Sequence, residues 1–163
     1  SVAHLGSLQV LRSPAGLLFC FVPLRSDSVA TAPANTPGGL ARADQAALDI
    51  GPAAFAGEVD FWAALTGWRV VASALPEFTL VLPPRGHPVR LLLQRLDAEP
   101  ADGPAMHLDL ACSEVGAATA YHLSLGASVV AEHEFWTVMR DPAGGTYCLT
   151  ARDPDTGRMP ARR

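Results

Sequence analysis

The sequence predicts an α+β protein in which two consecutive βαβββ units follow a β-hairpin. Two segments with helical periodicity, 52–68 and 113–127, are each preceded by one strand-like segment and followed by three. The phrase RSPAGLLFC, beginning at Arg12, returns with few changes as RDPAGGTYC from Arg140. A length of 163 residues, 49% of them hydrophobic, fits one domain with a buried core.

The N-terminal residues 1–24 are predicted to form the hairpin. The strand-like segment SLQVLR is followed by SPAG, which has turn chemistry, and then by the apolar segment LLFCFVPL. The next residues, 25–43, are rich in Ser, Pro, Thr, Gly and Ala without periodic large apolar residues. This composition predicts a flexible linker.

The first βαβββ unit is predicted over residues 44–99. The short strand DQAALDI precedes a helix that Pro52 opens and Gly67 ends, and the strands WRVVASA, EFTLVLP and VRLLLQRL follow. The helix carries one apolar stripe, formed by Phe55, Val59, Trp62 and either Leu65 or Ala63.

The second unit is predicted over residues 105–152. Its first strand is MHLDLAC, and its helix has Ser113 as the expected N-cap and Gly126 as its end. The strands SVVAEHE, FWTVMR and TYCLTAR follow, the last two joined by DPAGG. The polar tail 153–163 is expected to fray.

The repeated phrase extends to a match between 8–24 and 136–152. One reading is that Ser/Asp-Pro-x-Gly is simply a common turn. The matching Arg, Pro, Ala, Gly and Cys, with strand-like flanks on both sides, favour true repetition. The N-terminal hairpin is then the last hairpin of a third such unit.

Four motifs carry a family resemblance: FWAALTGW at 61–68, HLDL at 107–110, LSLGASVV at 123–130 and RDPAGGTYCL at 140–149. Together they resemble the glyoxalase-like branch of the vicinal oxygen chelate superfamily, which includes glyoxalases, bleomycin resistance proteins and dioxygenases. The resemblance covers residues 45–152. It implies a U-shaped cup of curved sheet with the helices outside, and a parent protein with two such domains.

The resemblance also implies positions for one divalent metal ion. Superfamily enzymes take ligands from the first and last strand of each unit, which correspond here to Gln45, Gln94, His107 and Cys148. Ala47 and Asp49 compete with Gln45, because the register of that strand is open. The two expected glutamates are missing, so we expect no cofactor; the alternative is one Zn, Ni or Fe ion, with Asp109 near the His107 and Cys148 pair.

A small organic ligand is the partner that this cup would take. The residues expected to line it are Gln94, His107, Asp109, Trp136 and Cys148. More conservative interpretations stay open: His107 and Asp109 form a hydrogen-bonded pair, and Cys148 is a small buried apolar residue.

Composition excludes several other classes of protein. The net charge of −4 argues against a nucleic-acid surface, and no apolar run approaches the ~20 residues of a membrane span. Three cysteines without close spacing fit reduced thiols in the cytoplasm. All basic residues are Arg, and with abundant Ala, Gly and Pro this indicates a GC-rich bacterial genome.

The sequence is therefore compatible with three functions. The first is a binding protein that sequesters a small molecule in the cup without the superfamily's full metal site. The second is a metal-dependent lyase, isomerase or dioxygenase that uses His107, and the third is a scaffold. Because a lone hairpin is marginal in water, residues 1–24 are expected to dock on an apolar patch or sheet edge of this chain or of a neighbouring one, and to give a homodimer.

Overall fold

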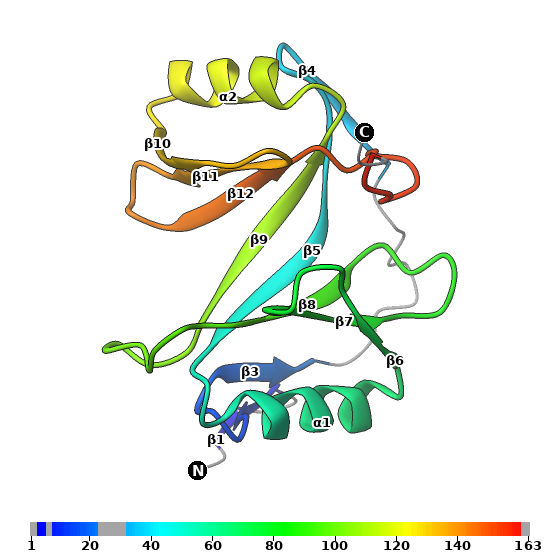
Figure 1. The fold of residues 1–163 in the computed structure, drawn as a ribbon, viewed down its shortest axis with the longest axis vertical. Coiled ribbons are helices and arrows are strands. Elements are labelled where there is room, and N and C mark those ends of the chain that lie inside the picture. Colours follow the sequence, from blue (N-terminus) through cyan, green and yellow to red (C-terminus); the bar gives the residue numbers. More distant parts are fainter. Residues whose placement is uncertain (1–2, 6–7, 23–31, 161–163) are drawn as a thin grey trace. The chain divides into compact units, whose positions relative to one another are not determined.

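The computed structural model describes residues 3–5, 8–22 and 32–160 (Figure 1). It confirms the α+β class, with two helices, each preceded by one strand and followed by three in chain order. The described chain forms two compact units, each assembled from two segments of sequence. The first unit comprises Ser1–Ala30 with Ala47–Met106, and the second comprises Thr31–Ala46 with His107–Arg163.

The first unit contains one βαβββ motif. Its sheet has the strand order β5-β8-β7-β6, and β7 is antiparallel to both of its neighbours. The core of the unit is the buried cluster of Leu48, Ile50, Val81 and Leu93. The motif consists of the end of β5 (Gly39–Ile50), α1 (Phe55–Thr66), β6 (Arg69–Ala72), β7 (Phe78–Leu82) and β8 (Arg90–Arg95).

Helix α1 ends as the sequence predicts. Gly67 adopts a positive φ of 68°, which glycine takes without steric cost, and its amide donates to the carbonyl of Ala63. The predicted apolar stripe is confirmed for Phe55, Val59 and Trp62, which pack against the core of the first unit.

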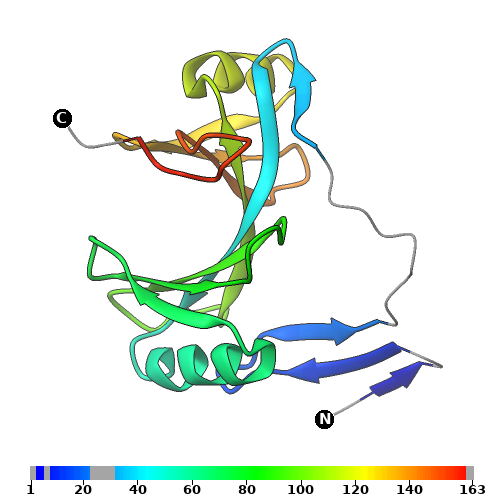
Figure 2. The same ribbon diagram turned by 90° about the vertical axis from the view of Figure 1, so that its right-hand side faces the viewer.

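The N-terminal strands form a separate three-stranded antiparallel sheet, β1 (Ala3–Leu5), β2 (Leu8–Arg12) and β3 (Leu18–Phe21). The β2–β3 hairpin lies beside α1 (Figure 2). The Phe19 ring packs edge-on against the rings of Phe61 and Trp62, with centroids 5.8 and 5.1 Å away. The hairpin therefore docks on an apolar patch of this chain, as expected.

A buried carboxylate reinforces this contact. Glu58 of α1 has no exposed surface, and its two oxygens accept hydrogen bonds from the Ala15 amide (2.9 Å) and from Nε1 of Trp62 (2.8 Å). Because each carboxylate oxygen has a donor, the group is buried at a lower cost in free energy.

The two copies of the repeated phrase form the same turn. The Ser13 amide donates to the carbonyl of Leu17, and the Asp141 amide donates to the carbonyl of Gly145, each at 2.9 Å. Gly16 and Gly144 take matching φ values of 99° and 94°. The sequence repeat is thus also a repeat of backbone conformation.

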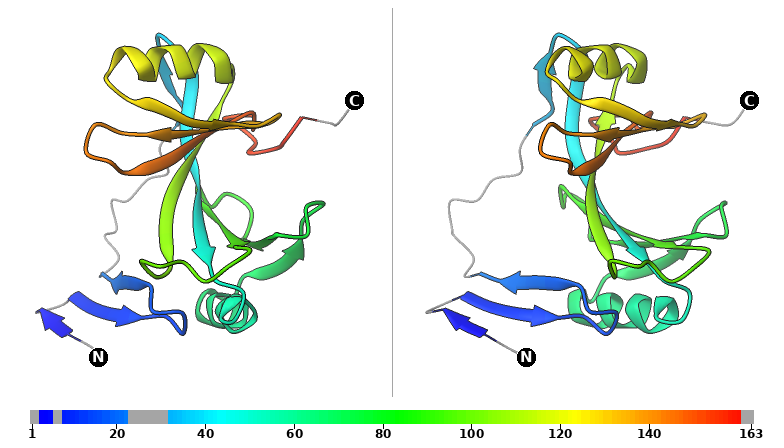
Figure 3. Two further views of the ribbon diagram at one scale, coloured as in Figure 1. Left: turned by 60° about the vertical axis from the view of Figure 1, so that its left-hand side comes forward. Right: turned by 90° about the vertical axis from the view of Figure 1, so that its left-hand side faces the viewer.

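The second unit contains the other βαβββ motif and a short hairpin. Its strand order is β10-β11-β12-β9-β5. Strand β11 is antiparallel to both of its neighbours, β10 and β12, and β12 is parallel to β9. Helix α2 lies over β10, β11 and β12 (Figure 3). The elements are β4 (Ala34–Thr36), the start of β5, β9 (Ala105–Cys112), α2 (Val115–Ser124), β10 (Ser128–Glu132), β11 (Trp136–Arg140) and β12 (Thr146–Thr150).

The predicted linker over 25–43 requires a correction. Its second part is strand β4 and the start of β5, which pair antiparallel, whereas residues 25–31 lie outside the described part of the chain. The hairpin packs closely on α2, because a Cβ atom on Gly38 would lie 2.8 Å from the Cα of Ala118. Small residues allow this close approach. The same small residues gave this segment the composition of a linker in the sequence.

Two smaller predictions also change. Helix α2 begins after Glu114, because the Ser113 hydroxyl accepts a hydrogen bond from the Leu40 amide at 3.0 Å instead of capping the helix. The first part of the tail, 153–158, forms a turn instead of fraying: Asp153 Oδ1 accepts hydrogen bonds from the amides of Asp155 and Thr156, and the Asp153 amide donates to the carbonyl of Arg158. Residues 161–163 lie outside the description.

None of the described helices combines the length and the apolar character that a membrane crossing needs.

Candidate functional site

The alternation of side chains along β9 sorts polar from apolar residues. Leu110 and Cys112 face the core beneath α2, with Cys112 fully buried. Successive side chains of a strand point to opposite faces, so His107 and Asp109 share the other face. The sequence MHLDLAC therefore places an imidazole and a carboxylate side by side, away from the helix.

The neighbouring strand β12 adds a thiol to this pair. Cys148 lies opposite Asp109 in the parallel ladder. Its Sγ is 3.6 Å from Nε2 of His107, and the same Nε2 is 3.3 Å from Oδ1 of Asp109. One donor atom from each of these three side chains lies within 4.8 Å of the other two.

Strand β5 brings Gln45 to the same group. The Gln45 side chain is buried, and its Nε2 donates a hydrogen bond to Oδ2 of Asp109. Of the three candidates on this strand, Gln45 is thus placed beside the cluster. In this arrangement it contacts the carboxylate through its amide nitrogen.

A buried ion pair that sequence reasoning missed completes the cluster. Arg152, just after β12, donates from Nε and Nη2 to both carboxylate oxygens of Asp44, at 2.6–3.2 Å. Its Nη1 lies 3.8 Å from Oδ2 of Asp109. Arg152, Asp44 and Asp109 are each only 4% exposed, so these charges interact with little screening by water.

The sequence holds little signal for this pair. Asp44 stands at the border of the predicted linker, and Arg152 stands at the border of a polar tail. Both positions favour a solvated charge, and 108 residues separate the two. Only the strand order, in which β5 and β12 flank β9, brings them near each other.

Burial controls the state of the thiol. The pKa of Cys148 is raised, chiefly by burial; the negative charge of Asp109 adds to this, whereas the hydrogen bond with His107 opposes it. The thiol is therefore neutral at pH 7 when no metal ion is bound.

Trp136 shares the cluster's face of the sheet. On β11, Val138 pairs with Cys148 and Trp136 pairs with Thr150, and cross-strand partners point to the same side. The Trp136 ring stacks on His133, with centroids 4.4 Å apart and ring planes 19° from parallel. This places an aromatic surface on the side of the second unit that carries His107 and Asp109.

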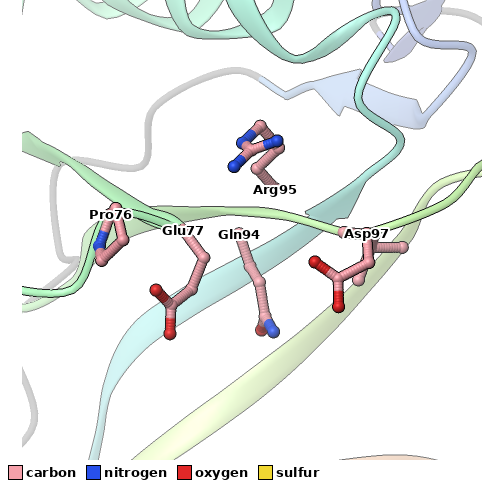
Figure 4. A pocket seen from close by; sticks show the side chains of 6 residues that line it. Pro76, Glu77, Gln94, Arg95 and Asp97 are labelled. Atoms are coloured by element: carbon pink, nitrogen blue, oxygen red, sulfur yellow. The ribbon is translucent and has the colours of Figure 1, made fainter.

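Gln94 belongs to the first unit, where it lines an open pocket of about 430 Å³. Figure 4 shows Glu77, Gln94 and Asp97 directed to one side of this segment, and Arg95 directed to the other. Gln94 was predicted as a ligand together with residues that lie in the second unit, so its part in a metal site stays a prediction.

The donor set fits a transition-metal ion. Ligand atoms around one tetrahedral ion lie about 3.3–3.8 Å apart, and the two measured separations at His107 fall in this range. Oδ1 of Asp109 is buried and accepts no hydrogen bond from the described residues. A nitrogen, an oxygen and a sulfur donor suit zinc and related ions. The hydrogen bond from Gln45 would orient Asp109 as the outer contacts of metal ligands commonly do.

The architecture of two βαβββ motifs is that expected of a glyoxalase-like protein, and comparison with known families agrees. The family model described as a glyoxalase-like domain matches residues 45–150. The chain therefore belongs to the glyoxalase-like domain family of the vicinal oxygen chelate superfamily. A search of curated proteins gives no match.

Comparison with solved structures gives matches at low sequence identity, and the two with a TM-score of 0.50 share the fold. Methylmalonyl-CoA epimerase from Mycobacterium tuberculosis is 16% identical with a TM-score of 0.50, and the match covers 66% of this chain and 85% of that one. A mutant of 4-hydroxymandelate synthase from Streptomyces coelicolor is 13% identical with a TM-score of 0.50, over 93% of this chain and 61% of that one. Glyoxalase I from Zea mays is 18% identical with a TM-score of 0.35, over 88% and 53%.

Proposed function

We propose that this protein binds a small organic molecule at a site centred on His107, Asp109 and Cys148, and that these side chains hold one divalent transition-metal ion. The carrying observation is the convergence of three unlike donor atoms within 4.8 Å, one of them a buried carboxylate oxygen without a hydrogen-bond partner among the described residues. The glyoxalase-like family supports a small-molecule ligand.

The balance of buried charge supports a divalent ion. Asp44 and Asp109 contribute two negative charges, and Arg152 contributes one positive charge. Buried charges are costly unless they are compensated. A divalent cation that displaces the proton of Cys148 would bring the sum to zero, because it adds two positive charges and creates one thiolate.

The ion would act as a Lewis acid toward an oxygen atom of the bound molecule. The chain's own residues would do the rest: Gln45 holds Asp109 in place through its amide, and the Trp136 ring offers an apolar surface to the ligand. Gln94, in its separate pocket, stays a proposed ligand contact. Lyase, isomerase and dioxygenase chemistry are the reaction classes that such a site could serve.

A second function, binding without metal, is favoured by two observations on the donor groups. The buried Cys148 thiol has a raised pKa, and Oδ2 of Asp109 is already engaged by Gln45. In that case, the face would bind a small molecule through hydrogen bonds and the Trp136 ring alone. The homodimer, the cytoplasmic location and the bacterial origin expected from the sequence stay predictions of this proposal.

Metal content separates these two functions. The untagged chain should be incubated with Zn²⁺, Ni²⁺ or Fe²⁺, dialysed, and analysed for bound metal by mass spectrometry. We expect about one equivalent to be retained. Asp109→Asn and Cys148→Ser should each lower retention at least tenfold, because each removes a charged donor of the site.

His87→Ala is the matched control, because His87 is an exposed histidine of the first unit. It should retain metal like the parent chain. Retention of no metal by the parent chain would overturn the metal-dependent function. A thermal-shift screen with aromatic and apolar metabolites would then test binding without metal, and a screen without hits would remove that function too.

A further inference from the structure

The cluster contains two carboxylates that compete for a single guanidinium group. Arg152 uses Nε and Nη2 on Asp44 and leaves Nη1 at 3.8 Å from Oδ2 of Asp109, beyond hydrogen-bonding distance. An Arg–carboxylate pair is strongest when it is bidentate, and Asp44 has that arrangement here. Asp109 has only the longer ionic contact with Arg152.

From this arrangement we infer that Asp44 is a positioning residue of the site: by holding Arg152, it keeps Asp109 available to the ligand side of the cluster. The effect of Asp44 on metal binding rests on the proposed function. The pairing of Arg152 with Asp44 rather than with Asp109 does not, because it applies equally to the metal-free protein.

Without Asp44, Arg152 can pair with Asp109 instead. Arg152 is 4% exposed, so a guanidinium that lost Asp44 could not readily recover its hydrogen bonds from water. The nearest remaining carboxylate that the described contacts give it is Asp109. A bidentate pair of Arg152 with Asp109 would occupy the oxygen that now faces His107 and would bring a positive charge to the site.

The surrounding chain holds Arg152 and Asp44 together. The tail turns back directly after Arg152, with the Gly157 amide donating to the carbonyl of Asp153 at 2.7 Å. A Cβ atom on Gly157 would lie 3.2 Å from Oδ2 of Asp44, so the turn packs against this carboxylate. The side chain of Arg42 on β5 also donates to the carbonyl of Asp155. The tail predicted to be frayed thus takes part in building the site.

The first test is a structural one on metal-free protein. Asp44→Asn keeps the shape of the side chain and removes its charge. The crystal structure of this variant should show Arg152 hydrogen-bonded to Asp109 through two nitrogens. An Arg152 side chain that stays on residue 44 or turns to solvent would overturn the inference, whether or not the protein binds metal.

The second test measures cobalt binding, with Co²⁺ as the probe because its absorption bands report thiolate coordination. Asp44→Asn should weaken binding at least tenfold. The double variant Asp44→Asn/Arg152→Gln should recover most of the lost affinity, because no guanidinium remains to occupy Asp109. A purely structural role for the ion pair predicts the opposite, since the double variant would then bind no better than the single one.

Arg158→Gln controls for a change of charge on the tail, because Arg158 is exposed and lies outside the cluster. It should bind Co²⁺ like the parent chain, and thermal unfolding of every variant reports whether the fold is retained. A double variant without recovery would overturn the inference. A parent chain that binds no cobalt would instead count against the proposed function, and the crystal structure of Asp44→Asn would still decide the role of Asp44.

Discussion

At the scale of single residues, burial sets the chemistry of the second unit. Cys112, in the core beneath α2, has its pKa raised from 9.0 to about 11, chiefly by desolvation, which outweighs the opposing hydrogen bond with the Thr150 backbone and the charge of Arg152. In the unfolded chain, the thiol titrates near its ordinary value. The folded state therefore keeps a proton that the unfolded state releases in alkaline solution.

This difference predicts a loss of stability at high pH. The contribution of Cys112 is fully present below pH 9 and is lost as the pH rises toward 11, because the unfolded state then binds fewer protons. The free energy of unfolding should fall by up to about 1.4 kcal/mol per pH unit for this thiol. Urea unfolding of the metal-free parent chain and of Cys112→Ala, at pH 8 and in the alkaline range, measures it. An identical pH dependence in both proteins would contradict the prediction.

The residues of the candidate site were only partly predictable. His107, Asp109 and Cys148 could be found because a short alternating motif and a repeated phrase mark them in the sequence. The amide of Gln45 was expected to bind a metal ion, but in the structure it donates to Asp109. Asp44 and Arg152 were missed because an ion pair between distant charges leaves no local pattern.

At the scale of elements, the contact between the N-terminal hairpin and α1 depends on a carboxylate with two neutral donors. Glu58 accepts from the Ala15 amide of the hairpin and from Trp62 of its own helix. Glu58 has no exposed surface, so water cannot easily replace either bond. The Glu58 side chain thus connects the N-terminal hairpin to helix α1.

Glu58→Gln should loosen the hairpin. The amide group keeps one acceptor oxygen and turns an NH₂ group toward the other donor, which leaves a buried donor unsatisfied at a cost of about 1–3 kcal/mol. Hydrogen exchange of the amides in β2 and β3 should quicken accordingly. Asp60→Asn, at an exposed carboxylate on the same helix, serves as the control and should leave these exchange rates unchanged. Equal rates in the two variants would refute this role of Glu58.

The strands and helices were largely predictable, because both βαβββ motifs have clear periodicity and the turn signals fall at their ends. The exception is β4 with the first residues of β5, where small residues and Pro are typical of a linker. These residues are ordered by tertiary contacts: Leu40 bonds to Ser113, and Gly38 lies against α2. Local propensity contains no information about such contacts.

At the scale of the whole molecule, the proposed metal ligands all fall in one of the two compact units. His107, Asp109, Cys148 and the contacting Gln45 belong to the second unit. A ligand that binds only the folded state stabilises it by about 2.7 kcal/mol at a concentration of one hundred times its Kd. That stabilisation should appear first where the ligand binds.

Saturation with zinc should therefore slow hydrogen exchange in 32–46 and 107–160 more than in the described residues of the first unit. Mass spectrometry of peptides with and without the metal measures this. Asp109→Asn, treated in the same way, should show no such protection. Protection confined to the first unit would place the ion elsewhere, with the acidic side of the Gln94 pocket as the next region to examine.

Two of the boundaries between the compact units fall inside strands: β5 crosses one between Ala46 and Ala47, and β9 crosses another between Met106 and His107. A gene fragment cut at either point would therefore end in the middle of a strand. The second unit needs residues from both sides of a stretch of sequence that belongs to the first. An engineer who wanted the second unit without the first would have to splice 31–46 to 107–163 with a new connection, since every contiguous segment that contains both parts also contains 47–106.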